Sequence, residues 1–261
     1  MLSLTPVVRN LLVLNILFFI ADAYIVPLIG GLALRSFLSP HYTPFQLVSY
    51  MFLHGNFGHL FGNMFGLFMF GPLLERAWGS RRFLFFYFFT GIGAGLLFSL
   101  INFVEMSQLK EAVQTYLQYP TPDGLADFLN RHAKGLFNAN SSFLTKFEDD
   151  PTNQQYIRDS IGFVEGIFDR QVNIPMVGAS GAIFGILMAF GLLFPNMELF
   201  LLFFPFPIKA KYFVTFYGLY ELYAGMRNAP SDNVAHFAHL GGMLFAFLLL
   251  RYWNSKRNNF Y

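Results

Sequence analysis

The chain contains no cysteine among its 261 residues, which excludes disulfide bonds, zinc–thiolate sites and cysteine nucleophiles. It also has few charged residues: they make up 12% of the chain, whereas a soluble domain usually has about 25%. The formal net charge is only +2, so charge gives no reason to expect a nucleic-acid partner. This shortage of charge indicates a protein embedded in lipid.

Long apolar segments make up much of the chain. Hydrophobic residues account for 55% of the chain and include 36 phenylalanines. Because a helix needs about 20 mostly apolar residues to cross a bilayer, we predict six transmembrane helices from this sequence. Their approximate ranges are Val7–Ile29, Val48–Leu74, Phe83–Val104, Ile174–Phe194, Lys211–Gly225 and Val234–Trp253. The predicted fold class is therefore all-α, a polytopic membrane helical bundle.

Lysine and arginine are unevenly divided between the predicted loops. If the N-terminus is cytoplasmic, the short outer loops hold only Arg35 and Arg227. The inner side then holds Arg9, Arg76, Arg81, Arg82, Lys209, Lys211, Arg251, Lys256 and Arg257. Since cytoplasmic loops carry an excess of these residues, we predict that both termini are cytoplasmic. With no organelle-targeting signal in the sequence, a bacterial cell (inner) membrane is the expected location.

Residues 105–173 differ in composition from the predicted spans. They carry more acidic than basic residues, and after Tyr156 apolar side chains recur at helical spacing. We predict a helix there with Asp150 as its cap and Pro151 in its first turn, and another helix starting at Asp123. This segment is expected to be a helical extracytoplasmic insertion between the third and fourth spans.

The chain is thus predicted to divide into three parts. Residues 1–104 hold spans one to three, residues 105–173 form the insertion, and residues 174–261 hold spans four to six with a short cytoplasmic tail. Within the last part, the apolar segment Leu199–Pro207 is interrupted by prolines. We expect it to lie in the membrane interface or to form a short hairpin.

A Gly-Ala-Ser-Gly sequence at 178–181 is the most informative motif. Glycines beside a serine allow a substrate backbone to approach the hydroxyl closely. We predict a helix from about Ser180 to Phe194, roughly 22 Å long, in a bilayer core about 30 Å thick. The serine would then lie below the outer surface, at a helix N-terminus that favours a developing oxyanion. Alternatively, Gly181 and Gly185 form a small-residue packing face.

A serine needs a base to become an effective nucleophile, and His239 in the sixth predicted span is a candidate. Gly242 and Ala246 would let this helix approach a neighbour closely, and His239 lies on nearly the same face as Gly242. If that neighbour is the glycine face of the helix bearing Ser180, the two side chains can meet. Alternatively, His236 and His239 are interfacial side chains or metal ligands, and we assign His236 no role.

Polar residues also occur in the second predicted span. His59 and Asn63 are four residues apart and therefore share a helix face, and both can donate hydrogen bonds to an anionic oxygen. Gly58, Gly62 and Gly66 repeat every four residues and predict one close-packing face. The alternative is that His59 and Asn63 satisfy one another within the bundle.

These motifs together resemble the rhomboid family of intramembrane serine proteases, in its bacterial form. The His-x-x-x-Asn sequence at 59–63, the Gly-x-Ser-Gly sequence at 178–181 and the Ala-His-x-x-Gly sequence at 238–242 follow one another in that family's order. The segment Glu75-Arg76 is similar to its Glu-Arg turn. The resemblance covers all six predicted spans.

The resemblance implies a role for each motif residue. Ser180 would be the nucleophile and His239 the general base, a dyad without a carboxylate. His59, Asn63 and the Ser180 backbone N–H would form the oxyanion hole. The loop around the serine would be shaped by Gly178 and Gly181.

The resemblance also implies the reaction and its partners. The enzyme would hydrolyse transmembrane segments of single-pass membrane proteins near the extracytoplasmic face, through an acyl-enzyme intermediate. It would need no cofactor and no metal. The lipid bilayer is an expected partner, nucleic acid is not, and the oligomeric state stays open.

Two features depart from the family pattern. Bacterial members often carry a Trp-Arg pair where this chain has Phe45-Gln46, which leaves the anchoring of that loop open. The insertion is also longer than the family's usual connection, and it is either a lid that selects substrates or a tolerated surface addition.

Competing functions are an inactive rhomboid-like protein that binds membrane clients, a metal or haem membrane protein that uses the histidines, and a solute transporter.

Overall fold

The computed structural model describes residues 4–200, 206–227 and 234–257, and these are mostly helical. The chain forms two compact units. Unit 1 consists of Met1–Leu34, Thr43–Ser99 and Pro175–Tyr261. Unit 2 consists of Arg35–Tyr42 and Leu100–Ile174.

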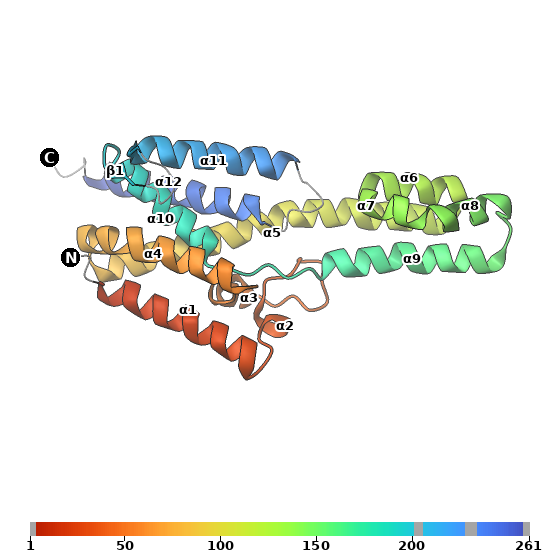
Figure 1. Cartoon of the computed structure of the whole chain (residues 1–261), viewed down its shortest axis with the longest axis horizontal. Helices are drawn as coiled ribbons and strands as arrows, with labels where there is room; N and C mark the ends of the chain where they lie inside the picture. Colours follow the sequence, from red (N-terminus) through yellow and green to blue (C-terminus); the bar gives the residue numbers. More distant parts are fainter. Residues whose placement is uncertain (1–3, 201–205, 228–233, 258–261) are drawn as a thin grey trace. The chain divides into compact units, whose positions relative to one another are not determined.

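Unit 1 is a helical bundle with one small strand pair (Figure 1). Its elements are α1 (Pro6–Tyr24), α2 (Ile29–Leu32), α3 (Gln46–Ser49), η1 (Tyr50–Phe52), α4 (Phe57–Trp78), the first part of α5 (Ser80–Gln118), α10 (Ser180–Leu193), β1 (Glu198–Leu199), β2 (Ile208–Lys209), α11 (Ala210–Arg227) and α12 (His236–Arg257). In the described part of the chain, α1, α4 and α5 are long and apolar enough to cross a membrane, and α10 is a shorter apolar helix. The chain is a multi-pass membrane protein, and the count of six spans stays a prediction.

Several predicted span boundaries are wrong. The first predicted span ends at Ile29, whereas α1 ends at Tyr24, and the fourth starts at Ile174, whereas α10 begins at Ser180. The second predicted span starts at Val48, but α4 begins at Phe57, because Asn56 is extended and its side chain accepts the N–H of His59. The third ends at Val104 in the prediction, whereas α5 continues to Gln118. No proline or glycine interrupts α5 after Gly95, and Pro120 follows its end.

At the centre of unit 1, α10 contacts α4, α11 and α12. Most of its residues are buried. It can approach α12 closely because two glycines meet, and a Cβ at Gly242 would overlap the carbonyl of Gly181. This contact confirms that α12 packs on the serine-bearing helix. Gly185, however, faces α5, where a Cβ would lie 2.7 Å from Thr90 Cβ.

The predicted glycine face of the second span is mostly wrong. A Cβ at Gly62 would meet no described atom within 4 Å, and one at Gly58 would meet only the nearby Asn56 side chain. Gly66 does pack closely, because a Cβ there would lie 2.8 Å from Ile183 of α10. The α4–α10 contact therefore uses Gly66 and not the whole repeat.

Glu75 joins the N-terminus of α1 to the end of α4. Its side chain is only 3% exposed. The carboxylate accepts the backbone N–H groups of Val7 at 3.1 Å and Val8 at 3.0 Å, and the hydroxyl of Ser80 at 2.6 Å. A negative charge at a helix N-terminus is favourable because unpaired N–H groups point at it. This carboxylate therefore fixes α1 against the α4–α5 turn.

The loop before α4 is anchored without a Trp-Arg pair. The Gln46 side chain, 1% exposed, donates to the carbonyl of Gly31 at 3.1 Å. Ser49 Oγ donates to the carbonyl of Leu32 at 2.6 Å. These two side chains thus bond to backbone carbonyls at the end of α2.

The segment after α10 contains a strand pair. β1 and β2 are antiparallel, with Glu198 opposite Lys209 and Leu199 opposite Ile208. The base of the expected hairpin is therefore present, while its tip at 201–205 lies outside the described residues, as does the end of the expected tail at 258–261.

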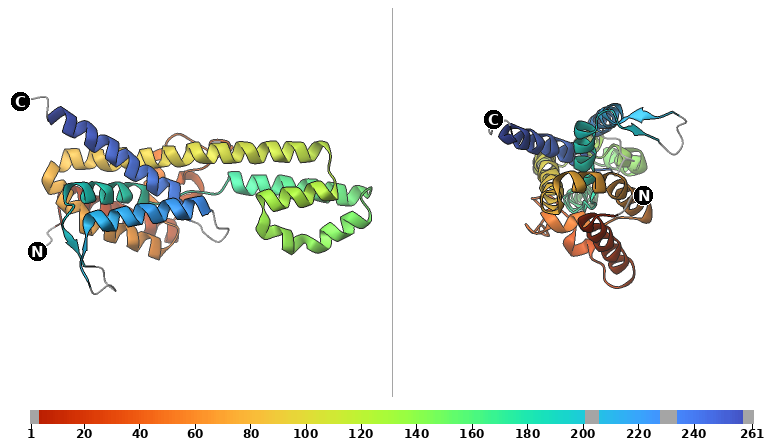
Figure 2. Two further views of the ribbon diagram at one scale, coloured as in Figure 1. Left: turned by 90° about the horizontal axis from the view of Figure 1, so that it is seen from above. Right: turned by 90° about the vertical axis from the view of Figure 1, so that its left-hand side faces the viewer.

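Unit 2 is a helical unit with its own apolar core. Besides the end of α5 it contains α6 (Pro122–His132), α7 (Lys134–Phe137), η2 (Asn138–Asn140), α8 (Ser141–Asp149) and α9 (Gln154–Val172). Its buried core side chains come from α5, α6, α8 and α9, and Figure 2 shows the end of α5 running alongside α9. Tyr116 donates from α5 to Ser160 Oγ of α9 at 2.6 Å.

The helix starts in unit 2 differ slightly from the predicted ones. α9 begins at Gln154 and not at Pro151, because the Asn153 side chain, not that of Asp150, accepts the N–H groups of the first turn. α6 begins one residue before Asp123, with Thr121 as its cap. The extracytoplasmic location of this unit stays a prediction.

Glu75→Gln is expected to lower the stability of the bundle. The amide loses the charge and one acceptor oxygen, a cost of about 1–3 kcal/mol, or several degrees in the midpoint of thermal unfolding measured in detergent. Glu111→Gln is the control, since this residue is exposed on α5. Equal midpoints for the two variants would contradict the role given to Glu75.

Candidate active site

The loop before Ser180 is held by backbone hydrogen bonds to two distant segments. Leu34 and Met176 exchange both of their backbone hydrogen bonds, at 3.0 and 2.8 Å. The N–H of Gly178 donates to the carbonyl of Tyr50 at 2.9 Å. These contacts fix the backbone that leads into α10, which begins at Ser180 as predicted.

Gly178 is a position that only glycine fits well. Its φ is +127°, a conformation that L side chains rarely adopt. A Cβ there would lie 2.6 Å from His59 Nε2 and 3.6 Å from Ser180 Oγ. The missing side chain therefore leaves room for the imidazole of His59 to stand beside the serine loop.

Ser180 and His239 meet across the close contact of α10 and α12. Ser180 Oγ lies 2.9 Å from His239 Nε2, a hydrogen-bond distance. Ser180 is partly exposed and His239 is 8% exposed. The contact follows from the glycine pair, since each side chain lies within one helical turn of Gly181 or Gly242.

The ring of His239 is held on one face by Phe184. The two rings are stacked, with centroids 4.1 Å apart and planes 7° from parallel. Phe184 lies one turn after Ser180 on α10, so the serine and the stacking ring share a helix face. This stack restricts rotation of the imidazole.

A carboxylate lies behind the histidine, and the sequence interpretation did not assign it a role. Glu221 of α11 is 2% exposed, and its Oε2 lies 2.8 Å from His239 Nδ1 and 2.6 Å from His236 Nδ1. The expected dyad without a carboxylate is therefore wrong, because Glu221 contacts His239. The sequence did hold a sign of this residue, since an acidic side chain within a predicted span is costly unless it is paired.

His59 and Asn63 lie along the α4 face that meets α10. His59 lies next to Gly178, and Gly66 lies next to Ile183. Asn63 comes between His59 and Gly66 on the same face of α4, so it faces the first turn of α10. Asn63 is 5% exposed, and its Nδ2 has no hydrogen-bond partner among the described residues. It therefore does not donate to His59, which contradicts the alternative of a self-satisfied pair.

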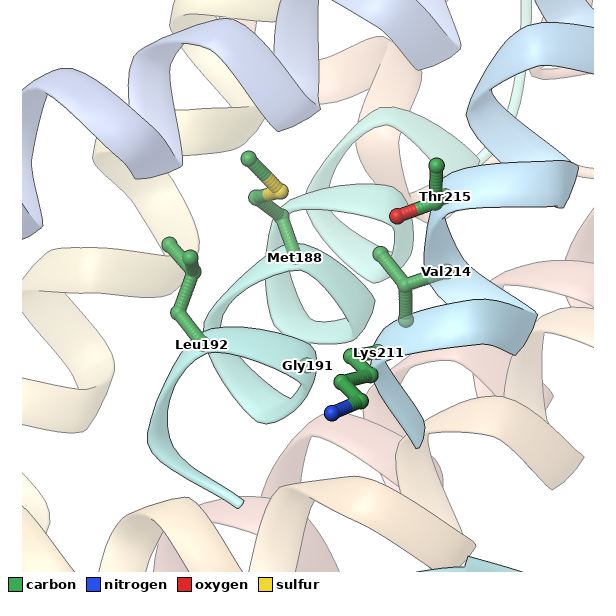
Figure 3. A pocket seen from close by; sticks show the side chains of 6 residues that line it. All are labelled: Met188, Gly191, Leu192, Lys211, Val214 and Thr215. Carbon is green, nitrogen blue, oxygen red and sulfur yellow. The ribbon is translucent and has the colours of Figure 1, made fainter. Parts of the chain in front are cut away.

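A small pocket lies elsewhere, between the end of α10 and the start of α11 (Figure 3). It is lined by Met188, Gly191, Leu192, Lys211, Val214 and Thr215. None of the predicted site residues lines it.

The class of protein is thus a helical, multi-pass membrane protein with a serine–histidine contact at the start of its central helix. The family model described as the Rhomboid domain matches residues 41–109 and 160–255. The chain belongs to the rhomboid family.

Similarity to a curated relative is confined to a short region. The chain is 40% identical over 57 residues to "Rhomboid-like protein 11, chloroplastic" of Arabidopsis thaliana. The aligned region covers 22% of this chain and 20% of that relative. The chain therefore matches about a fifth of the relative's length, and no activity is transferred from it.

Gly178→Ala is expected to slow the reaction of Ser180 with a fluorophosphonate probe by about 100-fold, since displacement of site groups by about 1 Å can cost that much. The added Cβ would displace His59 and strain the backbone by about 1–3 kcal/mol. The matched control is Gly62→Ala, where a Cβ would meet no described atom within 4 Å. Similar labelling rates for both variants would contradict the role of Gly178.

Proposed function

We propose that this protein is an intramembrane serine endopeptidase that cleaves transmembrane segments of other membrane proteins near the extracytoplasmic face. Ser180 is the nucleophile and His239 the general base. The observation that carries the proposal is the 2.9 Å contact between Ser180 Oγ and His239 Nε2. A serine hydroxyl is weak until a neighbouring base accepts its proton.

In the acylation step, Ser180 Oγ attacks the scissile carbonyl carbon and its proton passes to His239 Nε2. The carbonyl π electrons move to the oxygen, which becomes an oxyanion. When the tetrahedral intermediate collapses, the C–N bond breaks and His239 returns the proton to the leaving amine. An ester between Ser180 and the substrate remains.

In the deacylation step, water takes the place of the amine. His239 accepts a proton from the water, whose oxygen attacks the ester carbonyl. The C–O bond to Ser180 then breaks, and the proton goes to Ser180 Oγ. The products are a carboxylic acid and the regenerated enzyme.

The oxyanion is stabilised by His59, Asn63 and the Ser180 backbone N–H. Support comes from the buried, unpaired Nδ2 of Asn63, a donor without an acceptor among the described residues, and from the position of His59 beside Gly178. A fixed donor in a site with little water stabilises a developing charge more than it would in water. The N-terminus of α10 adds its positive dipole end.

The depth of the site suits a membrane-embedded substrate. α10 has 14 residues, or about 21 Å of helix, which is shorter than the hydrocarbon core of about 30 Å. Ser180 at its start therefore lies below one surface. A substrate helix hides its carbonyls in hydrogen bonds, so the segment must unwind there before attack.

The membrane and orientation belong to the same proposal. The excess of lysine and arginine in alternate loops favours cytoplasmic termini, and the cell membrane is the proposed location because the sequence shows no organelle-targeting signal. Unit 2 then lies on the extracytoplasmic side, as the predicted insertion.

Probe labelling tests the proposal directly. We expect a fluorophosphonate to label the purified protein in detergent, and we expect Ser180→Ala and His239→Ala to abolish labelling while both variants still show a cooperative melting transition. Labelling of Ser180→Ala at the wild-type level would reject Ser180 as the nucleophile. Failure of the folded wild type to react would favour the alternative, an inactive rhomboid-like protein that binds membrane proteins.

Asn63→Ala is expected to lower kcat for cleavage of a reconstituted transmembrane substrate by about 100- to 1000-fold, because one oxyanion donor is lost. KM should change little, since the donor acts on the transition state. Gly62→Ala, on the adjacent position, is the control. A variant with raised KM and normal kcat would place Asn63 in substrate binding instead.

A further inference from the structure

Glu221, His236 and His239 form a buried cluster, of which the proposed function uses only His239. We propose that Glu221 is a positioning residue for His239, and that His236 fixes the carboxylate of Glu221. This inference rests on the proposed function, because it concerns the base in that reaction. The arrangement would extend the serine–histidine pair by a buried carboxylate.

Packing of α11 on α12 brings Glu221 to this position. A Cβ at Gly218 would lie 3.0 Å from Met243, and one at Gly225 would lie 3.2 Å from His236. These contacts run in opposite directions along the two helices, so the helices are antiparallel. Glu221, between the two glycines, therefore stands opposite the turn that holds His236 and His239.

The contact with Glu221 determines which nitrogen of His239 carries the proton. A carboxylate only accepts hydrogen bonds, so His239 Nδ1, at 2.8 Å from Glu221 Oε2, must carry the hydrogen. In the neutral ring Nε2 then has a lone pair, and it lies 2.9 Å from Ser180 Oγ. This is the tautomer that can accept the serine proton.

The carboxylate also stabilises the charge that forms on the base. When His239 takes the proton of Ser180, it becomes an imidazolium next to Glu221. The carboxylate is 2% exposed, and an interaction between opposite charges is stronger in such a site than in water. Glu221 thus acts through His239 and touches no substrate atom.

His236 contributes by orienting the carboxylate. Its Nδ1 lies 2.6 Å from the same Oε2 that His239 contacts. Two N–H donors at one oxygen restrict rotation of the Glu221 side chain. Without His236, the carboxylate would be free to turn away from His239.

The same three side chains have the composition of a metal site, since their ligand atoms lie within 4.8 Å of one another. A metal ion would need a deprotonated Nδ1 on His239. The ring would then carry its hydrogen on Nε2, facing Ser180, and could not accept the serine proton. The hydrogen-bond distances therefore favour a proton between these atoms, and metal binding becomes an outcome that the experiment distinguishes.

The test measures both the rate and the end-point of fluorophosphonate labelling in detergent. Glu221→Gln keeps the shape of the side chain and removes its charge, and we expect the labelling rate to fall by about 100- to 10,000-fold while the end-point stoichiometry stays at the wild-type value. His236→Asn should give a smaller reduction, again at full end-point. Glu198→Gln is the control for the same chemical change at an exposed position.

If Glu221 has only a structural role, the labelling experiment gives a different result. If Glu221 only stabilises the fold, Glu221→Gln lowers the melting midpoint and the end-point together, while the molecules that remain folded react at the wild-type rate. That result overturns the proposal, and so does an unchanged rate at full end-point. If EDTA changes the labelling rate of the wild type, the cluster holds an ion and the hydrogen-bonded arrangement is rejected.

These outcomes are separable from the failure of the proposed function. If Ser180→Ala is still labelled, the nucleophile is misassigned and the proposed function fails. If Ser180→Ala is inert but Glu221→Gln reacts at the wild-type rate, only the role of Glu221 is rejected.

Discussion

The close approach of α10 and α12 at Gly181 and Gly242 is the constraint on which the candidate site depends. With a Cβ at Gly242, the two backbones would have to separate because the added atom would overlap the carbonyl of Gly181. Ser180 and His239 lie within one turn of these glycines, so the 2.9 Å contact between their side chains exists only at this helix separation. Packing of small residues is a main source of helix association in lipid, and here it also sets the distance between Ser180 Oγ and His239 Nε2.

Around this contact, polar groups are buried in an otherwise apolar bundle, and three contacts hold them in place. Phe184 stacks on the imidazole of His239, Glu221 accepts its Nδ1 hydrogen, and the loop of Gly178 is tied to Tyr50. Each support comes from a different element of unit 1. Since buried polar groups are costly without partners, the contacts of His236 and His239 with Glu221 stabilise both rings. Asn63 Nδ2, by contrast, has no hydrogen-bond partner among the described residues.

Much of the fold was predictable from periodicity and composition. The apolar segments correspond to helices, and Ser180 was correctly expected to begin one. The errors lie at boundaries. Asn56 was missed as the cap of α4, and α5 runs past Val104 because its polar second half continues the same helix. A local cap or the absence of a helix breaker determines such ends, while the hydrophobic pattern reports only the middle of an element.

For the site, the sequence by itself determined the residue types: a serine between glycines, two histidines three apart, a His-x-x-x-Asn pair and an acid within an apolar segment. It also determined that helices carry them, because that follows from local spacing. Only the tertiary structure decided which of these side chains meet. It brought His239 to Ser180, a contact that the sequence predicts only if the two helices pack together. It also joined both histidines to Glu221 and used Gly66 but not Gly62 for packing. The physical reason is that helix register and rotation are set by side-chain packing between segments far apart in the chain, which local spacing does not encode.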